Sequence, residues 1–487
     1  MNLKIVGKNT IIYGIGNIGL RASAFLLIPL YTHTLSVKEY GLLSTLLLTI
    51  QLMIILMSVG MRTSFLRFSK EYESRNLMGE LLVGCLLINV IVCIVIAGVT
   101  VLFLKPFFRS ILHIDQVGGY LVLTSCAAVA QTLSLQVMSY YQSRNEALKF
   151  SIVGGSAALL LFITNLILLV ILKAGLRGAL IASIITYSSV FMFVFVDVLL
   201  KKTGIGISVS MLPRLFRFGF PLVFSMLGQS IMGTSSIYFL GYYEGLEVVA
   251  VYSLGYKLAT IVGIVLTLPF QLAYQPFIFQ NIGKHELKDT MGRLFIYFII
   301  GVAIISCIII MLSRMFLPFI APPDYSWAYL VIILVLPAVA FNGLIIFGET
   351  LLSIAKKTHV MGIVVGICGL LSVFLNYLLV PRMGWYGAII ASNVSCLSAG
   401  LVILILGKKA FPMTIEWLRA IMVIGFIATV LLLAFVLHTA NNLIFYGMTI
   451  STTFIFGFLL IIGKFFSDQE RATLKYGLDW IRLRLST

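Results

Sequence analysis

Two stretches of the chain repeat one another and decide how the rest is interpreted. Residues 152–183 read IVGGSAALLLFITNLILLVILKAGLRGALIAS, and residues 363–392 read IVVGICGLLSVFLNYLLVPRMGWYGAIIAS. Asn165 matches Asn376 within the apolar run, and after a gap of two residues both copies end on G-x-x-G-A-[LI]-I-A-S. Each apolar run approaches the roughly 20 residues that a transmembrane helix needs. The repeat therefore indicates a membrane chain built from two related halves.

The composition of the whole chain also indicates a membrane protein. Of its 487 residues, 60% are hydrophobic and only 10% are charged, whereas a soluble domain carries about 25% charged residues. Because a soluble core cannot hide this much apolar surface, we expect lipid to be the solvent. The composition excludes collagen, an intrinsically disordered chain, a disulfide scaffold and a cytosolic enzyme.

Fourteen segments of the chain are long and apolar enough to cross a membrane. Continuous apolar runs predict helices, because the strands of a membrane barrel alternate apolar and polar residues. We therefore predict an all-α polytopic membrane protein with 14 transmembrane helices. The first segment is interpreted as a span and not as a cleaved leader, because it shows no small-residue cleavage site. The predicted spans are 10–33, 41–61, 81–104, 117–141, 150–172, 178–197, 218–241, 248–274, 294–313, 327–353, 360–380, 384–407, 420–437 and 443–463.

The distribution of Lys and Arg predicts the orientation of the chain. With the N-terminus in the cytoplasm, 25 of the 34 Lys and Arg residues fall in cytoplasmic segments and seven in outer loops. This asymmetry places both termini in the cytoplasm, because cytoplasmic loops of membrane proteins carry the excess of basic residues. The net charge of +17 suits attraction to anionic lipid headgroups, so no nucleic-acid partner is expected.

The repeat predicts how the spans are grouped. Its two copies lie six predicted spans apart, so both have the same orientation, and the chain holds two parallel six-helix lobes plus a C-terminal helix pair. Two such lobes are typical of a transporter, because they can rock about a central cavity; a duplication that retains no motion is the alternative. The predicted divisions are the N-lobe 1–200, a cytoplasmic linker 201–217, the C-lobe 218–407, the last two spans 408–463 and a basic cytoplasmic tail 464–487.

The opening of the chain carries a family resemblance. Residues 16–44 read GNIGLRASAFLLIPLYTHTLSVKEYGLLS. Together with the repeated G-x-x-G-A-x-I-A-S and the 6+6+2 order of spans, this stretch resembles the polysaccharide flippases. They belong to the multidrug/oligosaccharidyl-lipid/polysaccharide exporter superfamily. The resemblance covers essentially the whole chain and implies two V-shaped lobes around a polar, cation-lined cavity.

The resemblance also implies a function. Flippases of this kind turn undecaprenyl-pyrophosphate-linked oligosaccharide repeat units from the inner to the outer leaflet of the bacterial inner membrane, by alternating access. The units then enter surface polysaccharide biosynthesis, as O-antigen of lipopolysaccharide or as capsule. The implied partners are the lipid-linked oligosaccharide, membrane lipid, H⁺ or Na⁺, and other polysaccharide assembly proteins.

Two basic residues lie inside predicted spans. Arg21 is eleven residues into the first span and Lys257 nine residues into the eighth, so both are near the middle of the membrane. A charge there costs about 2.5–3.5 kcal/mol on insertion scales and usually faces a watery cavity or a partner. We hypothesise that both bind the diphosphate of the substrate, and that Arg62 helps at the cytoplasmic mouth. The alternatives are neutralisation by a nearby carboxylate and, for Arg62, an ordinary anchor in the inner leaflet.

One acidic residue also lies well inside a predicted span. Glu349 stands about four residues before the inner end of the tenth span. Burial favours the protonated form of a carboxyl group, so such a residue can carry a proton or bind a sodium ion. We hypothesise that Glu349 couples transport to an ion gradient, and a structural partner for Lys257 or another cation is the competing interpretation.

Three other functions compete with the polysaccharide flippase. A peptidoglycan-precursor flippase shares the fourteen spans and the cationic cavity, whereas a cationic-drug antiporter needs an acidic cavity and usually has twelve spans. A membrane-embedded polysaccharide polymerase or ligase would need a large outer loop with catalytic residues, but the longest predicted outer loop, 105–116, is short. We therefore predict a carrier and no enzyme.

Neither a cofactor nor a metal site is predicted. The six cysteines lie in apolar runs and form no C-x-x-C pair, so they indicate neither zinc nor a disulfide framework. The G-x-G-x-x-G pattern at 14–19 lies inside the first span and follows no strand, which argues against a dinucleotide site. No Walker A sequence is present, so an ATP-driven pump is not expected.

Overall fold

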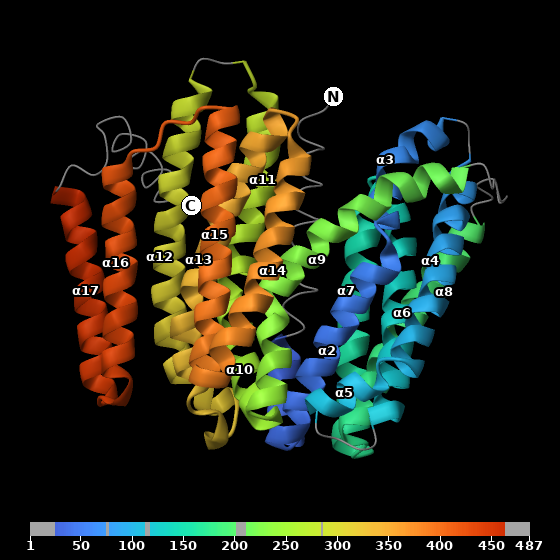
Figure 1. Cartoon of the computed structure of the whole chain (residues 1–487), viewed down its shortest axis with the longest axis horizontal. Coiled ribbons are helices and arrows are strands. Elements are labelled where there is room, and N and C mark those ends of the chain that lie inside the picture. Colours follow the sequence, from blue (N-terminus) through green and yellow to red (C-terminus); the bar gives the residue numbers. More distant parts are fainter. Residues whose placement is uncertain (1–24, 75–76, 113–116, 201–210, 284–285, 463–487) are drawn as a thin grey trace, which may run out of the picture. The chain divides into compact units, whose positions relative to one another are not determined.

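The architecture is helical throughout the part of the chain that the structure describes. The structure, a computed structural model, describes residues 25–74, 77–112, 117–200, 211–283 and 286–462. Within these ranges every regular element is a helix (Figure 1). Twelve of the described helical segments are long and apolar enough to cross a membrane, which confirms a polytopic all-α chain. The count of fourteen stays a prediction, because residues 1–24 lie outside the described ranges and the last helix is not one of the twelve.

The first half of the chain forms seven helices after the short helical stretch 25–34. They are α2 (Val37–Ser58), α3 (Met61–Glu73), α4 (Met78–Leu102), α5 (Lys105–Leu112), α6 (Val117–Ser143), α7 (Ala147–Leu166), which continues into the π-helical turn η1 (Ile167–Ile171), and α8 (Gly175–Leu200). The capping box of Ser36 and Glu39 fixes the start of α2, because each side chain bonds the backbone N–H of the other residue.

In its described part, the second half of the chain forms nine α-helices. They are α9 (Leu212–Tyr243), α10 (Leu246–Ala259), α11 (Leu268–Gln280), α12 (Leu287–Ile320), α13 (Ala328–Ile354), α14 (Thr358–Met383), α15 (Trp385–Ala410), α16 (Trp417–Val436) and α17 (Asn442–Ile462). A π-helical turn, η3 (Gly263–Thr267), lies between α10 and α11. Helices α10 and α11 therefore form one apolar segment with an irregular turn in its middle.

The chain divides into two compact units. The first unit holds residues 1–282 and 316–412, and the second holds residues 283–315 and 413–487. In the first unit, α2–α8 pack as one group of helices, called here the N-group. Helices α9–α11 and α13–α15 pack as another, called here the C-group. The division into two six-helix lobes and a final pair stays a prediction.

A partly buried arginine connects helices of the second unit. The guanidinium of Arg314 on α12 donates hydrogen bonds to the carbonyl oxygens of Leu437 (3.0 Å) and Ala440 (2.5 Å), in the turn between α16 and α17. The same guanidinium lies 4.3 Å from the ring centre of Phe445. Carbonyls at the end of a helix lack intrahelical donors, so Arg314 supplies donors to this turn, where Leu437 also accepts from the N–H of Ala440.

The sequence repeat has a counterpart in backbone geometry. Gly175 and Gly384 have φ angles of +55° and +58° and stand at the starts of α8 and α15. The next glycine of each copy packs against the preceding helix. A Cβ at Gly178 would lie 3.1 and 3.2 Å from the Cβ atoms of Ala174 and Leu168, and one at Gly387 would lie 2.5 Å from the carbonyl oxygen of Leu379. Both turns therefore need glycine, since only glycine adopts positive φ freely and allows this approach.

The repeated asparagines anchor equivalent helices. Both are fully buried, and each donates a hydrogen bond of 2.8 Å to the carbonyl four residues earlier. Asn165 on α7 also accepts a hydrogen bond from the Tyr31 hydroxyl (3.0 Å), while Asn376 on α14 donates to Ser235 Oγ on α9 (3.3 Å). An amide in the membrane interior thus ties two helices together in each group.

We expect Asn165→Leu and Asn376→Leu to destabilise the protein to a similar extent. Each change removes one interhelical hydrogen bond, which costs about 0.6–2 kcal/mol in membrane proteins. Thermal unfolding of the purified protein in detergent measures the effect. Thr429→Val is the control, because the Thr429 hydroxyl is exposed and bonds only within α16. A loss for one asparagine and none for the other would contradict the equivalence.

Candidate functional site

Lys257 lies where the two helix groups of the first unit meet. Its ammonium on α10 is 3.4 Å from the Tyr40 hydroxyl and 3.5 Å from Ser44 Oγ, both on α2, and 5.1 Å from the centre of the Tyr40 ring. Tyr40 is fully buried and packs edge-on against Tyr325, with ring centres 5.8 Å apart. Both α2 and α10 begin at the predicted outer end, so this contact lies toward that end.

The backbones of the two groups also approach closely at the predicted outer end. A Cβ at Gly41 on α2 would overlap the carbonyl oxygen of Leu246, the first residue of α10. At the same end, Thr32 in the stretch before α2 donates a hydrogen bond of 2.5 Å to the carbonyl oxygen of Ile320, the last residue of α12. The N-group and the C-group are therefore in direct contact at this end, where little space is left between α2 and α10.

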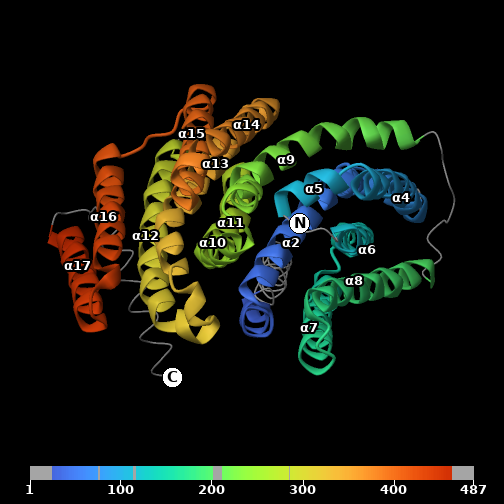
Figure 2. The same cartoon turned by 60° about the horizontal axis from the view of Figure 1, so that its bottom comes forward.

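Helix α9 contacts both groups (Figure 2). Its first turns pack against α3, where the backbones of Gly219 and Gly60 are in contact. Arg214 of α9 forms a bidentate ion pair with Glu71 of α3, with both N···O distances 3.0 Å. Its last turns lie in the C-group, where Ser236 Oγ is 3.2 Å from Ser392 Oγ. One continuous helix thus joins the two groups.

Arg62 lies at the opposite end of the N-group. It is the second residue of α3, is partly buried, and donates one hydrogen bond of 3.1 Å to the amide oxygen of Gln142. The 14 residues from Ser44 to Ser58, the end of α2, correspond to roughly 21 Å at 1.5 Å per residue, and Arg62 lies beyond the left-handed residues Val59 and Gly60. The structure therefore does not bring Arg62 and Lys257 together into one site.

Neither cation has an acidic partner. Among the described residues, no carboxylate lies within ion-pair distance of Arg62 or Lys257. Arg21, the other predicted diphosphate ligand, lies outside the described residues. Unpaired cations inside a membrane protein are expensive, and they usually face a water-filled cavity or a ligand. Anion binding by Lys257 and Arg62 therefore stays a prediction, and the cost of an unpaired cation in the membrane is the reason for it.

Glu349 lies on α13 and has no hydrogen-bond or ion-pair partner among the described residues. Its side chain is partly buried, as is that of Asn342 two turns earlier on the same face of α13. The neighbouring Phe347 packs on Tyr274 of α11, with ring centres 4.7 Å apart. No group of three or more His, Cys, Asp or Glu in the described part of the chain is arranged to hold a metal ion.

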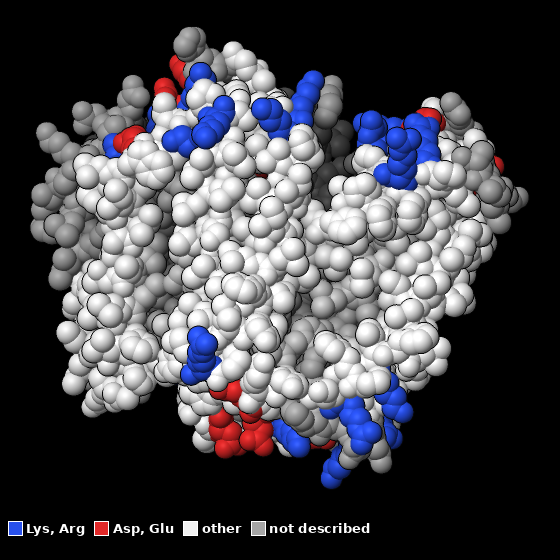
Figure 3. Space-filling view, in the orientation of Figure 1, with Lys and Arg blue, Asp and Glu red and all other residues white. Residues whose placement is uncertain are grey.

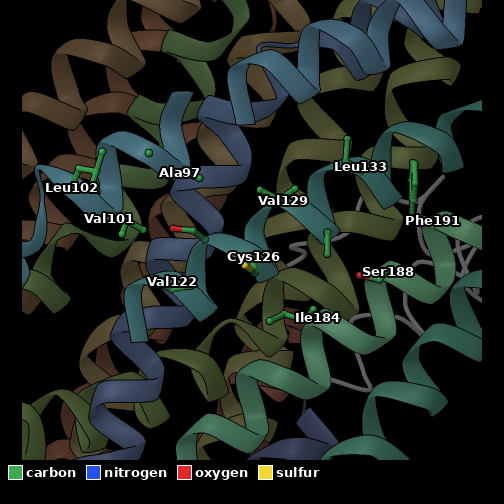
Figure 4. Close-up of a pocket in the computed structure, with 13 residues that line it drawn as sticks. Ala97, Val101, Leu102, Val122, Cys126, Val129, Leu133, Ile184, Ser188 and Phe191 are labelled. Atoms are coloured by element: carbon green, nitrogen blue, oxygen red, sulfur yellow. The ribbon is translucent and has the colours of Figure 1, made fainter. Parts of the chain in front are cut away.

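Two apolar pockets open on the first unit. One pocket, of about 650 Å³, lies between the N-group and the C-group and is lined by residues of α2, α4, α5 and α9. Two of its lining residues, Thr49 and Tyr238, form a hydrogen bond between their hydroxyls, with an O···O distance of 2.9 Å. The other, of about 630 Å³, lies wholly within the N-group between α4, α6 and α8 (Figure 4). Neither pocket is lined by a charged residue, so neither is suited to a diphosphate.

Charged side chains gather at the two ends of the helices. Figure 3 shows Lys and Arg clustered over α3 and the start of α9, while most of the visible face between the two ends is white. This arrangement leaves an uncharged band that suits the bilayer core.

Comparison with models of protein families assigns the chain to a family. The family model described as "Polysaccharide biosynthesis protein" matches residues 6–282, more than half of the chain. The chain belongs to this polysaccharide biosynthesis protein family. A second family model, MatE, matches residues 221–378 of this family member. The search of curated proteins finds no match.

Solved structures show which fold this family member shares. The lipid II flippase MurJ in an inward closed conformation matches with a TM-score of 0.71 at 14% identity, over 93% of this chain and 99% of that chain. An inward-facing multidrug resistance MATE transporter matches with a TM-score of 0.64 at 14% identity, over 82% and 94%. A MATE transporter from Vibrio cholerae matches with a TM-score of 0.58 at 16% identity, over 84% and 96%. The fold is therefore that of the MOP superfamily of transporters.

Proposed function

We propose that this chain is a flippase for lipid-linked oligosaccharides. It would turn undecaprenyl-pyrophosphate-linked repeat units from the inner to the outer leaflet of the bacterial inner membrane, for O-antigen, capsule or a related surface polysaccharide. The observation that carries the proposal is the match of the polysaccharide biosynthesis family model to residues 6–282. The transporter fold and the predicted cytoplasmic termini agree with it.

The unpaired cations support an anionic substrate. A pyrophosphate needs charge-assisted donors, which a guanidinium supplies as a fork and an ammonium as a compact charge. Arg62 at the predicted inner end and Lys257 toward the predicted outer end would contact the diphosphate at different stages of its passage, because most of the length of α2 lies between Arg62 and Ser44, which contacts Lys257. A cationic-drug antiporter would need acidic residues at these positions.

The contacts between the helix groups support loading from the inner leaflet. Tyr40, Gly41 and Lys257 hold α2 against α10 at the predicted outer end. Transport would require these contacts to separate when the cavity opens to the other side, as alternating access demands.

The location of lipid-linked units in a deletion strain tests the function. We expect a strain without this chain to accumulate complete units on the inner leaflet, and the wild-type chain to restore their export. Single units on the outer leaflet would point to a polymerase. Arrest of cell-wall precursor export, with normal polysaccharide units outside, would favour a peptidoglycan-precursor flippase.

Glu349→Gln tests ion coupling. If Glu349 carries the coupled ion, we expect the variant, whose side chain cannot ionise, to lose the pH or sodium dependence of translocation. Transport of a fluorescent lipid-linked sugar into vesicles, measured with and without a gradient, gives the readout. Asn342→Leu, on the same face of α13, is the control for packing. Unchanged coupling in Glu349→Gln would leave Glu349 a structural residue.

A further inference from the structure

The groove within the N-group has the form of a binding site for a hydrocarbon chain. Side chains of α4, α6 and α8 face it, as Figure 4 shows. Six of its thirteen lining residues are small, namely Ala97, Gly98, Ser125, Cys126, Ala130 and Ser188. A Cβ at Gly98 would meet nothing within 4 Å. Its volume of about 630 Å³ falls within the roughly 300–1,000 Å³ that is typical of pockets for small ligands.

The length of the groove matches one leaflet. Along α6 it extends from Val122 to Leu133, and these eleven residues correspond to about 16 Å of helix axis. The hydrocarbon core of a bilayer is about 30 Å thick, so the groove covers roughly half of it. An acyl chain anchored at one surface fills such a length, whereas a long isoprenoid chain exceeds it.

Two cations stand at the predicted outer end of this groove. The Lys105 ammonium lies 3.7 Å from where a Cβ of Gly118 would be, and Gly118 is one turn before Val122 on α6. The Arg177 guanidinium lies 5.8 Å from the centre of the Tyr120 ring, and Arg177 is two turns before Ile184 on α8.

Both cations are available to a ligand. Lys105 and Arg177 are exposed, and no acidic side chain in the described ranges pairs with either of them. A phosphate headgroup at the membrane surface suits such a pair, because each nearby Lys or Arg contributes about 1 kcal/mol to the attraction of anionic lipid.

We propose that this groove binds one anionic phospholipid of the leaflet at the predicted outer end, with an acyl chain between α4, α6 and α8 and its phosphate between Lys105 and Arg177. The groove lies within the N-group, away from the Lys257 contact with the C-group. The bound lipid would therefore stabilise the N-group whatever the transported substrate is.

Lipid retention by the purified full-length protein tests the proposal. We expect dioleoyl phosphatidylglycerol to remain bound after detergent washing and to raise the melting temperature more than dioleoyl phosphatidylcholine, dihexanoyl phosphatidylglycerol or inorganic phosphate does. Phosphatidylglycerol with a photoreactive acyl chain should crosslink to α4, α6 and α8. Lys105→Gln and Arg177→Gln should each weaken retention about fivefold, since about 1 kcal/mol per cation is lost.

Matched variants separate this groove from general lipid contact. Gly98→Leu fills the groove, whereas Gly155→Leu adds the same side chain to open space on α7. We expect only the first to abolish retention. Lys38→Gln removes an exposed cation at the start of α2 and should change nothing. Equal retention in all variants, crosslinks confined to other helices, or displacement by undecaprenyl phosphate at equal concentration would overturn the proposal.

Discussion

Replacing Gly41 with leucine is expected to force α2 away from α10 and to open the predicted outer end. Even a single Cβ at Gly41 would overlap the backbone of Leu246, and backbone cannot move aside as a flexible side chain does. Overpacking of this kind costs about 1–3 kcal/mol, so we also expect a lower melting temperature. The distance between spin labels on cysteines placed at Lys38 and Glu247, both exposed, should increase by several ångströms.

The control for Gly41→Leu is Gly155→Leu, where the added side chain meets open space. Cys126, which is exposed, must first be replaced by serine so that the spin labels react only at the chosen sites; the other five cysteines are buried. If the label distance and the melting temperature of Gly41→Leu equal those of the wild type, the close contact of α2 with α10 is not a feature of the protein in the membrane.

Replacing Lys257 with methionine is expected to stop transport without loss of stability. The Lys257 ammonium is partly buried and has no acidic partner among the described residues, so removing its charge also removes a desolvation penalty. A charge-assisted hydrogen bond to a phosphate contributes about 1.5–3 kcal/mol, and its loss lowers affinity by about 10- to 150-fold. Export of lipid-linked units in a complementation assay and thermal unfolding measure the two effects.

Two further variants make the Lys257 result specific. Lys257→Arg keeps the charge and should retain part of the export, while Lys357→Met removes an exposed charge and should be neutral. Normal export by Lys257→Met would exclude Lys257 from the diphosphate site. A large fall in melting temperature would instead assign it to the contact with Tyr40 and Ser44.

The sequence predicted the helices well where hydropathy alone determines them. The apolar run 117–141 became α6 (Val117–Ser143), and the run 384–407 became α15 (Trp385–Ala410), because lipid requires each spanning segment to satisfy its own backbone. The run 248–274 became α10 and α11 with a π-helical turn between them. Hydropathy carries no information about such a turn, since the side chains on both sides of it are equally apolar.

The sequence predicted the candidate site only in part. It singled out Lys257 because a charge in an apolar run is costly, but not the partners of Lys257. Tyr40 and Ser44 lie more than 200 residues away from Lys257 in the chain. Polar residues near the start of a helix are common, so the sequence gives no sign that these two contact Lys257. Position along each span predicted the depth of Lys257 in the membrane and placed Arg62 at the cytoplasmic mouth, but it gives no distance between spans.

The hydrogen bonds of Arg314 to the turn between α16 and α17 have a consequence for truncated forms of the protein. A chain cut after residue 412 would leave the Arg314 guanidinium without the two carbonyls and the aromatic ring that now surround it. Arg314 would lose two hydrogen bonds and an aromatic contact, each of which contributes to the packing of α12. The last two helices therefore support α12, and their deletion is expected to lower the melting temperature of the rest of the chain.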